Sequence, residues 1–201
     1  MRPSVVLRSS KRNEIRTNPS AMAKAHRFSR GWRHAFVVAI ILVTAFAVTT
    51  ARLLVWPAQG MPARVDAIVM LAGPGDRLSA ALKLAREHRA ATLVVSQGWE
   101  GYGGPCPSAI SGVKLICFDP SPGNTRGEAE FASHLAHRYH WHSVALVTTL
   151  PQDTRARIIM RRCYSGSIYV VAASMPWADW PYQIAYGWGA LFKALILERA
   201  C

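Results

Sequence analysis

The sequence predicts an α/β fold, a doubly wound parallel sheet of about five strands, preceded by one transmembrane helix. Two observations support this prediction. Short apolar runs alternate with longer helical segments over residues 65–201, and an uninterrupted apolar stretch lies ahead of them. Strands that are continuous apolar runs are buried on both faces, and their alternation with helices implies right-handed crossovers in a parallel, Rossmann-like sheet.

The expected strands and helices follow one another through the whole domain, after a linker at residues 57–64. We expect strands in VDAIVMLAGPGD, ATLVVSQG, VKLICFD, SVALVTT and SIYVVAA. We expect helices over residues 78–88, 125–140, 152–163 and 181–199, and a loop rich in Gly and Pro over residues 99–107. In such a sheet ligands bind at the carboxyl ends of strands, near the point where strand order reverses.

The apolar stretch predicts a transmembrane helix over residues 35–56. From Ala35 the sequence runs AFVVAIILVTAFAVTTARLLVW. About 20 helical residues cover the roughly 30 Å of a bilayer's hydrocarbon core. Trp32 and Trp56 lie at its two ends, where indole rings favour the interface, and Arg52 is close enough to the boundary to reach headgroups.

The basic tail, residues 1–34, sets the expected orientation. It carries nine Lys or Arg residues against Glu14 alone, whereas the flank after the span has one Arg offset by one Asp. The positive-inside rule therefore places the N-terminus in the cytoplasm and the domain, residues 65–201, on the outer side of the membrane. The tail is rich in Ser, Arg and Asn without apolar periodicity, so we expect it to be disordered in water.

Two other interpretations of the apolar stretch stay open. A cleaved signal peptide would use residues 37–44 as its apolar region and residues 45–47 as its cleavage site, although its leader would be long. A buried core helix is the other interpretation, and it is disfavoured because residues 35–51 show no polar face.

The tail also holds most of the formal net charge of +13, which argues against nucleic-acid binding. The rest of the chain has 24 − 9 = 15 basic and 11 − 1 = 10 acidic residues, without a basic stripe that could track phosphates. We therefore expect the membrane and a small anionic ligand, and no nucleic acid, as partners.

All four cysteines follow the apolar stretch, and none lies in a C-x-x-C pair or near a His at zinc-ligand spacing, so no metal site is predicted. An even number of cysteines confined to an exported region is what disulfide pairing requires. We expect Cys106 to pair with Cys117, and Cys163 to pair with Cys201. Unpaired buried thiols in a cytosolic protein are the alternative.

The loops after the first two strands supply four candidate ligand-binding residues. Gly73 and Gly75 would let backbone N–H groups approach an anion at the N-terminus of the next helix, and Arg77 would add a guanidinium. A plain tight turn is the alternative. Ser96 ends the second strand without a G-x-S-x-G motif, which favours hydrogen bonding to a ligand over nucleophilic attack.

The two later helices supply the remaining candidates. Thr125 and Glu128 have the spacing of a capping box, with Thr125 as N-cap, and both could also bind a ligand at this helix N-terminus. Arg155 could hold a phosphate or carboxylate with two parallel hydrogen bonds. The aromatic residues near the C-terminus are expected to fill a core or interface, or to contact headgroups; they are Trp177, Trp180, Tyr182, Tyr186 and Trp188.

The order of four motifs resembles a family of bacterial envelope proteins of the YdcF, SanA and ElyC type, a domain of unknown function. The motifs are DAIVMLAGPGDR, VVSQG, NTRGEAE and VTTLPQDTRAR. Two departures are visible. Gln97 stands where the family has the first Gly of Ser-Gly-Gly, and residues 151–153 offer no His before Arg155.

The resemblance implies an α/β domain tethered at the cell envelope, with a role in envelope biogenesis or barrier function. Together with the candidate residues, it leads to the hypothesis of a membrane-anchored protein that binds a nucleotide-like or lipid-linked phosphate. Catalysis is left open, because no nucleophile with a base, paired carboxylates or metal cluster is evident. The alternative is a non-catalytic envelope factor that recognises a protein partner or a polymer.

Overall fold

The structure is a computed structural model, and it describes residues 19–98 and 105–201, with side chains from Trp32 onward. The first half of the predicted tail and most of the predicted loop at residues 99–107 lie outside the described residues. The chain forms two units, of which the first ends at Phe46 and the second is Ala47–Cys201.

The first unit holds most of one long helix, α1 (Pro19–Thr50), which continues into a π-helical turn, η1 (Ala51–Val55). Within them Trp32–Val55 has a mean hydropathy of 2.3 and is long enough to cross a membrane, as predicted for residues 35–56. The expected disorder of the tail in water stays a prediction, although the described residues 19–34 belong to α1. Helix α1 begins at Pro19, because Ala, Met and Lys residues ahead of the apolar stretch favour helix extension.

The second unit contains a five-stranded, all-parallel sheet with the order β3-β2-β1-β4-β5, which confirms the predicted doubly wound fold. The strands are β1 (Ala67–Met70), β2 (Thr92–Ser96), β3 (Lys114–Phe118), β4 (Ser143–Thr148) and β5 (Ser167–Ala172). The helices are α2 (Arg77–Arg86), α3 (Thr125–Tyr139), α4 (Leu150–Cys163), a short η3 (Trp177–Asp179) and α5 (Trp180–Ile196). The order reverses between β1 and β4, so the crevice that usually binds ligands lies between these two strands.

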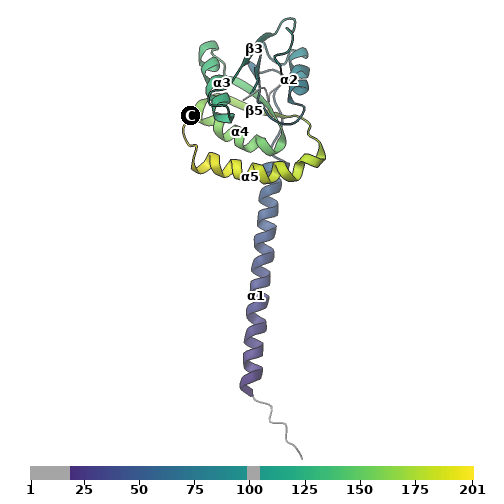
Figure 1. The fold of residues 1–201 in the computed structure, drawn as a ribbon, viewed down its shortest axis with the longest axis vertical. Helices are drawn as coiled ribbons and strands as arrows, with labels where there is room; N and C mark the ends of the chain where they lie inside the picture. Colours follow the sequence, from purple (N-terminus) through teal and green to yellow (C-terminus); the bar gives the residue numbers. More distant parts are fainter. Residues whose placement is uncertain (1–18, 99–104) are drawn as a thin grey trace, which may run out of the picture. The chain divides into compact units, whose positions relative to one another are not determined.

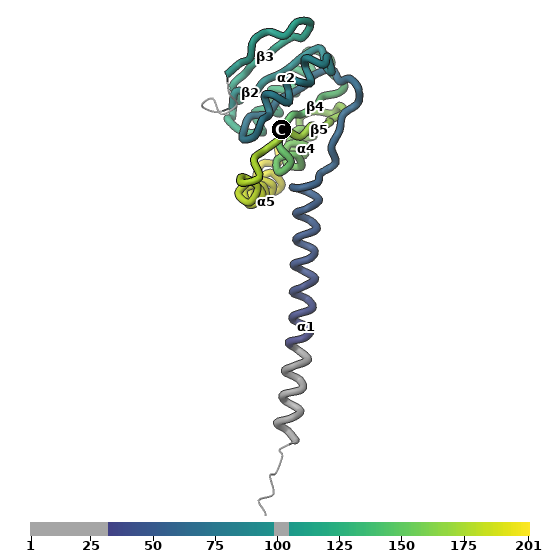
Figure 2. Tube along the Cα trace, turned by 90° about the vertical axis from the view of Figure 1, so that its right-hand side faces the viewer, coloured from purple at the N-terminus to yellow at the C-terminus, as the bar shows by residue number. Residues whose placement is uncertain are grey.

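Helices cover both faces of the sheet, as Figure 1 shows for α2 and α3 and Figure 2 shows from the side. Alternate residues of β1 face different cores: Val69 packs with α3 and α4, whereas Ile68 packs with α2. All four residues of β1 are buried. Continuous apolar strands are expected of a sheet covered on both faces.

The linker lies against the domain. The backbone N–H of Gly60 donates to the carbonyl of Val170 on β5 at 3.1 Å, and the side-chain amide of Gln59 donates to the buried carboxylate of Asp153. Asp153 also pairs with Arg157 one turn further along α4. These contacts fix the path of the chain from η1 into the sheet.

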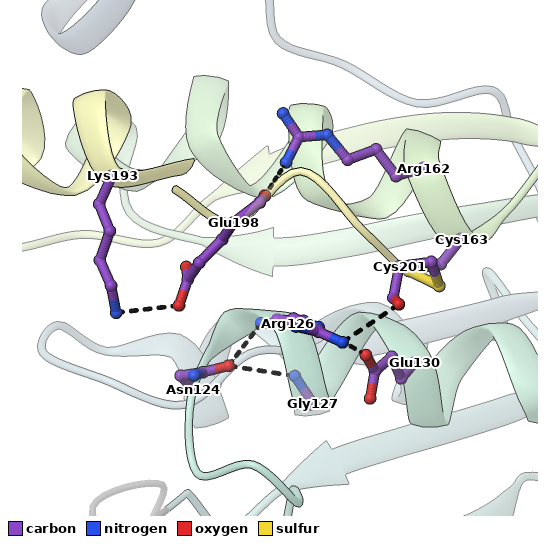
Figure 3. A network of polar contacts seen from close by, with 9 residues as sticks. All are labelled: Asn124, Arg126, Gly127, Glu130, Arg162, Cys163, Lys193, Glu198 and Cys201. Carbon is purple, nitrogen blue, oxygen red and sulfur yellow. Dashed lines mark hydrogen bonds and ion pairs between the residues drawn. A yellow bond between two sulfur atoms is a disulfide. The ribbon is translucent and has the colours of Figure 1, made fainter. Parts of the chain in front are cut away.

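Both predicted disulfides are present. Cys106 pairs with Cys117 on β3, with 5.9 Å between their Cα atoms, and Cys163 pairs with Cys201, at 5.0 Å. Figure 3 shows the second bridge, where the segment after α5 returns to the end of α4. Arg162 donates to the carbonyl of Glu198 in the same place, so covalent and polar contacts together hold this segment on α4.

Candidate functional site

A cavity of about 540 Å³ lies at the carboxyl edge of the sheet, where strand order reverses. Its walls come from the loop after β1, the segment that enters α3, the start of α4 and the start of α5. Four of the seven predicted ligand-binding residues line it: Gly73, Thr125, Glu128 and Arg155. The other three, Gly75, Arg77 and Ser96, lie outside the lining.

Arg77 is buried beneath the loop after β1, with 1% of its surface exposed. Nε donates to the carbonyl of Pro74, and Nη1 donates to those of Leu71 and Ala72. Nη2 donates to Thr149 Oγ1 at 3.3 Å and to Gln152 Oε1 at 2.7 Å. A guanidinium has five N–H donors, so these contacts use all of them.

Arg77 therefore shapes the loop instead of presenting its charge to the cavity, and it does not converge there with Arg155. Burial, against the opposing charge of Glu128 and with a smaller contribution from Arg155, lowers the pKa of Arg77 to about 10, so the guanidinium stays charged at neutral pH. The sequence places Arg77 in the first turn of a helix. Three of its acceptors lie in the preceding turn, whereas Thr149 directly follows β4 and Gln152 lies at the start of α4, far along the chain.

The two glycines of the turn allow this close packing. Gly73 has a φ of 128°, and a Cβ there would lie 2.9 Å from Arg77 Nη2. Gly75 has a φ of 96°, and a Cβ there would lie 2.5 Å from the side chain of Thr149 and 2.8 Å from the carbonyl of Ser174. The turn is thus built around Arg77, with Gly73 also forming part of the cavity wall.

The predicted capping box at the start of α3 is wrong. The N-cap is Asn124, which has an extended backbone and accepts hydrogen bonds from Arg126 N at 2.9 Å and Gly127 N at 3.2 Å (Figure 3). Because Asn124 takes the cap, the hydroxyl of Thr125 is left to accept from Gln152 Nε2 at 3.2 Å. The side chain of Glu128 is likewise released from the helix end.

Glu128 reaches across to the loop after β1, where its Oε1 accepts from Ala72 N at 2.6 Å. The side chain is 3% exposed, and burial raises its pKa against the opposing effects of Ala72, Ser96, Arg77 and Arg155. The buried hydroxyl of Ser96 lies beside this carboxyl, although its geometry falls short of a regular hydrogen bond. A buried acid at a cavity wall can hold a proton for a bound ligand.

Arg155 is the cation of the cavity wall. Its side chain is half-buried, and its guanidinium carbon lies 5.7 Å from the ring centre of Tyr186. Within residues 32–98 and 105–201, no hydrogen-bond acceptor and no carboxylate pairs with it. Arg155 differs in this respect from Arg77, which is fully bonded.

Sequence reasoning missed several other residues of the wall, among them Gln152, Tyr182 and Tyr186. Gln152 bonds to Arg77 and Thr125 at once, which joins the loops after β1 and β4 to the start of α3. Tyr182 and Tyr186 stack with ring centres 6.2 Å apart, and both line the cavity. Their spacing of four residues on a helix was the available signal, but it could not show that α5 closes the cavity.

The described groups of the cavity suit binding of an anion. They provide a half-buried guanidinium, a buried carboxyl with a raised pKa and two aromatic rings. No group of three metal-ligating side chains occurs among the residues with described side chains. Ser96 is fully buried and lies off the lining, so it is not placed to attack a ligand.

Comparisons of the chain with protein-family models, with curated proteins and with solved structures find no match. The resemblance to the YdcF, SanA and ElyC type therefore stays a prediction.

Proposed function

We propose that this chain is a membrane-anchored protein whose α/β domain binds an anionic, phosphate-bearing ligand in the cavity at the carboxyl edge of the sheet. The observation that carries the proposal is Arg155. Its guanidinium lies in the cavity wall without a hydrogen-bond acceptor or carboxylate partner among the described side chains. A guanidinium presents paired donors that match the oxygens of a phosphate.

The charges around the cavity favour an anion. Arg77 lies behind the wall as a second cation, beside the buried carboxyl of Glu128, whose pKa burial raises. A neutral Glu128 could also donate its proton to a phosphate oxygen, while Oε1 keeps its bond from Ala72 N. Phosphate oxygens could therefore be held by Arg155 on one side and by Glu128 on the other.

The size of the cavity fits a nucleotide-like or lipid-linked phosphate. A volume of about 540 Å³ falls within the roughly 300–1,000 Å³ of small-molecule sites. The stacked rings of Tyr182 and Tyr186 give one wall an apolar surface. Such a surface would accept a base or the first units of a lipid chain next to the phosphate.

The proposed location is the outer side of the cytoplasmic membrane, with α1 as a single-pass anchor and the tail in the cytoplasm. Two disulfides in the domain are compatible with an oxidising compartment, and the excess of basic residues before the span favours a cytoplasmic N-terminus. The motif resemblance extends the proposal to envelope biogenesis or barrier function.

The proposal is tested by ligand binding to the full chain in lipid nanodiscs. The probes are inorganic pyrophosphate, uridine diphosphate and a polyprenyl phosphate, and binding is followed by isothermal titration. Arg155→Gln is expected to weaken binding about ten- to a hundredfold, from charge-assisted bonds of about 1.5–3 kcal/mol. Arg161→Gln is the matched control, because Arg161 is exposed on the same helix and lies outside the cavity lining.

The outcomes separate the candidates. Binding of the polyprenyl phosphate alone would assign a lipid-linked ligand, and binding of the soluble probes would assign a nucleotide-like one. Equal affinities of Arg155→Gln and Arg161→Gln would refute the role of Arg155. If none of the three probes bound, the alternative of a non-catalytic factor that recognises a partner or polymer would replace the proposal.

A further inference from the structure

Helix α5 is mostly apolar, although only one of its faces is covered within the described part of the domain. Its 17 residues, WPYQIAYGWGALFKALI, include a single charged side chain, Lys193. An extended apolar face on such a helix is ordinarily covered by protein or by lipid.

The inner face of α5 packs on α4. Gly187, Leu191 and Ala194 recur at helical spacing on this face, and all three are buried. Arg162 of α4 donates to the carbonyl of Ala194 at 2.8 Å, which fixes the helix further. The orientation of α5 about its own axis is thereby set.

The outer face is exposed. Its large side chains are Tyr182, Tyr186, Phe192 and Ile196, with 68, 51, 62 and 48% of their surfaces exposed. Trp177, just before the helix, is 85% exposed. An apolar patch that extends along a whole helix is unusual on a soluble surface and marks a site of contact.

The contacts of α5 with the end of the apolar segment indicate what covers this face. Trp188 Nε1 donates to Thr50 Oγ1 at 3.1 Å, and a Cβ added at Gly187 would lie 3.3 Å from Leu54, which is buried. Thr50 and Leu54 both belong to the stretch that is apolar enough to span a membrane. The middle of α5 is therefore fixed beside the last turns of that stretch, where it leaves the bilayer.

We propose that the outer face of α5 lies on the bilayer, as an interfacial helix. Trp and Tyr favour the level of the headgroups, and Phe192 and Ile196 would lie among the upper parts of the acyl chains. Lys193 is exposed beside them, and its ammonium pairs with the carboxylate of Glu198 at 2.9 Å. The inference depends on the proposed span of α1. It shares Tyr182 and Tyr186 with the wall of the proposed anion site, whereas Phe192 and Ile196 lie outside that wall.

The test measures the surroundings of single positions in the full chain, reconstituted in vesicles of phosphatidylethanolamine and phosphatidylglycerol. A ketone-bearing amino acid, p-acetylphenylalanine, replaces one residue at a time and carries a nitroxide, which leaves the disulfides intact. Collision rates with oxygen, which concentrates in lipid, and with a water-soluble nickel chelate are compared. The positions are Phe192 on α5, Leu42 in α1 as the reference for the span, and Tyr139 on α3 as an exposed aromatic control.

A label at position 192 is expected to show a several-fold higher ratio of oxygen to nickel collisions than one at position 139. The reference at position 42 is expected to show a high ratio as well. A low ratio at 192 with a high ratio at 42 would overturn the inference and leave the span intact. Protection of position 192 from both reagents would also overturn it, because a protein partner or a second copy would then cover the helix. A low ratio at 42 would refute the span itself.

Discussion

Replacement of Arg77 by Met tests whether this arginine maintains the fold or binds the ligand. Methionine keeps much of the length and volume of the side chain but removes all five donors. The carbonyls of Leu71, Ala72 and Pro74 and the side chains of Thr149 and Gln152 would then lose a partner.

The expected loss follows from how deeply these bonds are buried. The bonds to Leu71 and Thr149 are fully buried, whereas water can reach the other three acceptors after the substitution. Two buried bonds from a charged donor, at about 1.5–3 kcal/mol each, give a loss of about 3–6 kcal/mol in the free energy of unfolding. For a domain of this size that corresponds to a fall of roughly 6–24 °C in Tm.

The assay is thermal unfolding of the full chain in nanodiscs, followed by near-ultraviolet circular dichroism. Arg86→Met is the matched control, because Arg86 is exposed at the other end of the same helix. The Tm of this variant is expected to stay within about 2 °C of the wild type. A variant Arg77→Met that kept its Tm but no longer bound the phosphate probes would refute the reasoning. Arg77 would then be a ligand residue.

Two other predictions concern Glu128 and the disulfides. Burial raises the pKa of Glu128 above its usual 4.5, so the folded state binds the proton more tightly and the free energy of unfolding falls as pH rises from 4.5 through the folded-state pKa. Denaturant titrations across this pH range should show a smaller fall in the free energy of unfolding for Glu128→Gln than for the wild type. An equal dependence on pH in the two proteins would contradict the raised pKa of Glu128. Loss of the bridge Cys163–Cys201, whose cysteines are 38 residues apart, should lower the free energy of unfolding by about 4 kcal/mol. Loss of Cys106–Cys117, whose cysteines are 11 residues apart, should lower it by about 3 kcal/mol. Urea unfolding of two variants, each with both cysteines of one bridge replaced by Ser, checks this ranking. A larger loss of unfolding free energy for the Cys106–Cys117 variant would contradict it.

The strands could be predicted from the sequence because burial leaves a local signature. Ala67–Met70 and Thr92–Ser96 are buried at every position, and each was an unbroken apolar run ending in small or polar residues. The alternation with helices then restricted the topology to a parallel sheet. The place of the cavity followed as well, because it depends on the chain order of strands and not on any one side chain.

The cap of α3 shows where local patterns stop being decisive. Asn124 and Thr125 are both good N-cap residues, and Glu128 lies three positions after Thr125. The backbone decides which of the two residues is the N-cap. Asn124 has a φ of −154°, and the cap therefore lies one residue earlier than predicted. Glu128 can therefore bond to Ala72, a partner that no pattern within the helix could reveal.

The roles of the two arginines were also beyond the sequence. Arg77 and Arg155 both follow a strand near the start of a helix, so their surroundings in the sequence look alike. The difference lies in tertiary contacts: Thr149 and Gln152 bond to Arg77, whereas Arg155 contacts the ring of Tyr186 and has no hydrogen-bond acceptor among the described side chains. These partners are supplied by packing of distant segments.

The strand order has a consequence for how the domain is made. β1 lies at the centre of the sheet, and Ala67 pairs with Thr92 on one side and with Val144 on the other. During synthesis the second pairing must wait until β4 has emerged, so one edge of a fully apolar strand stays open for much of that time. Half-paired apolar strands are prone to aggregation, so β1 is expected to be most exposed to it until β4 pairs with its open edge.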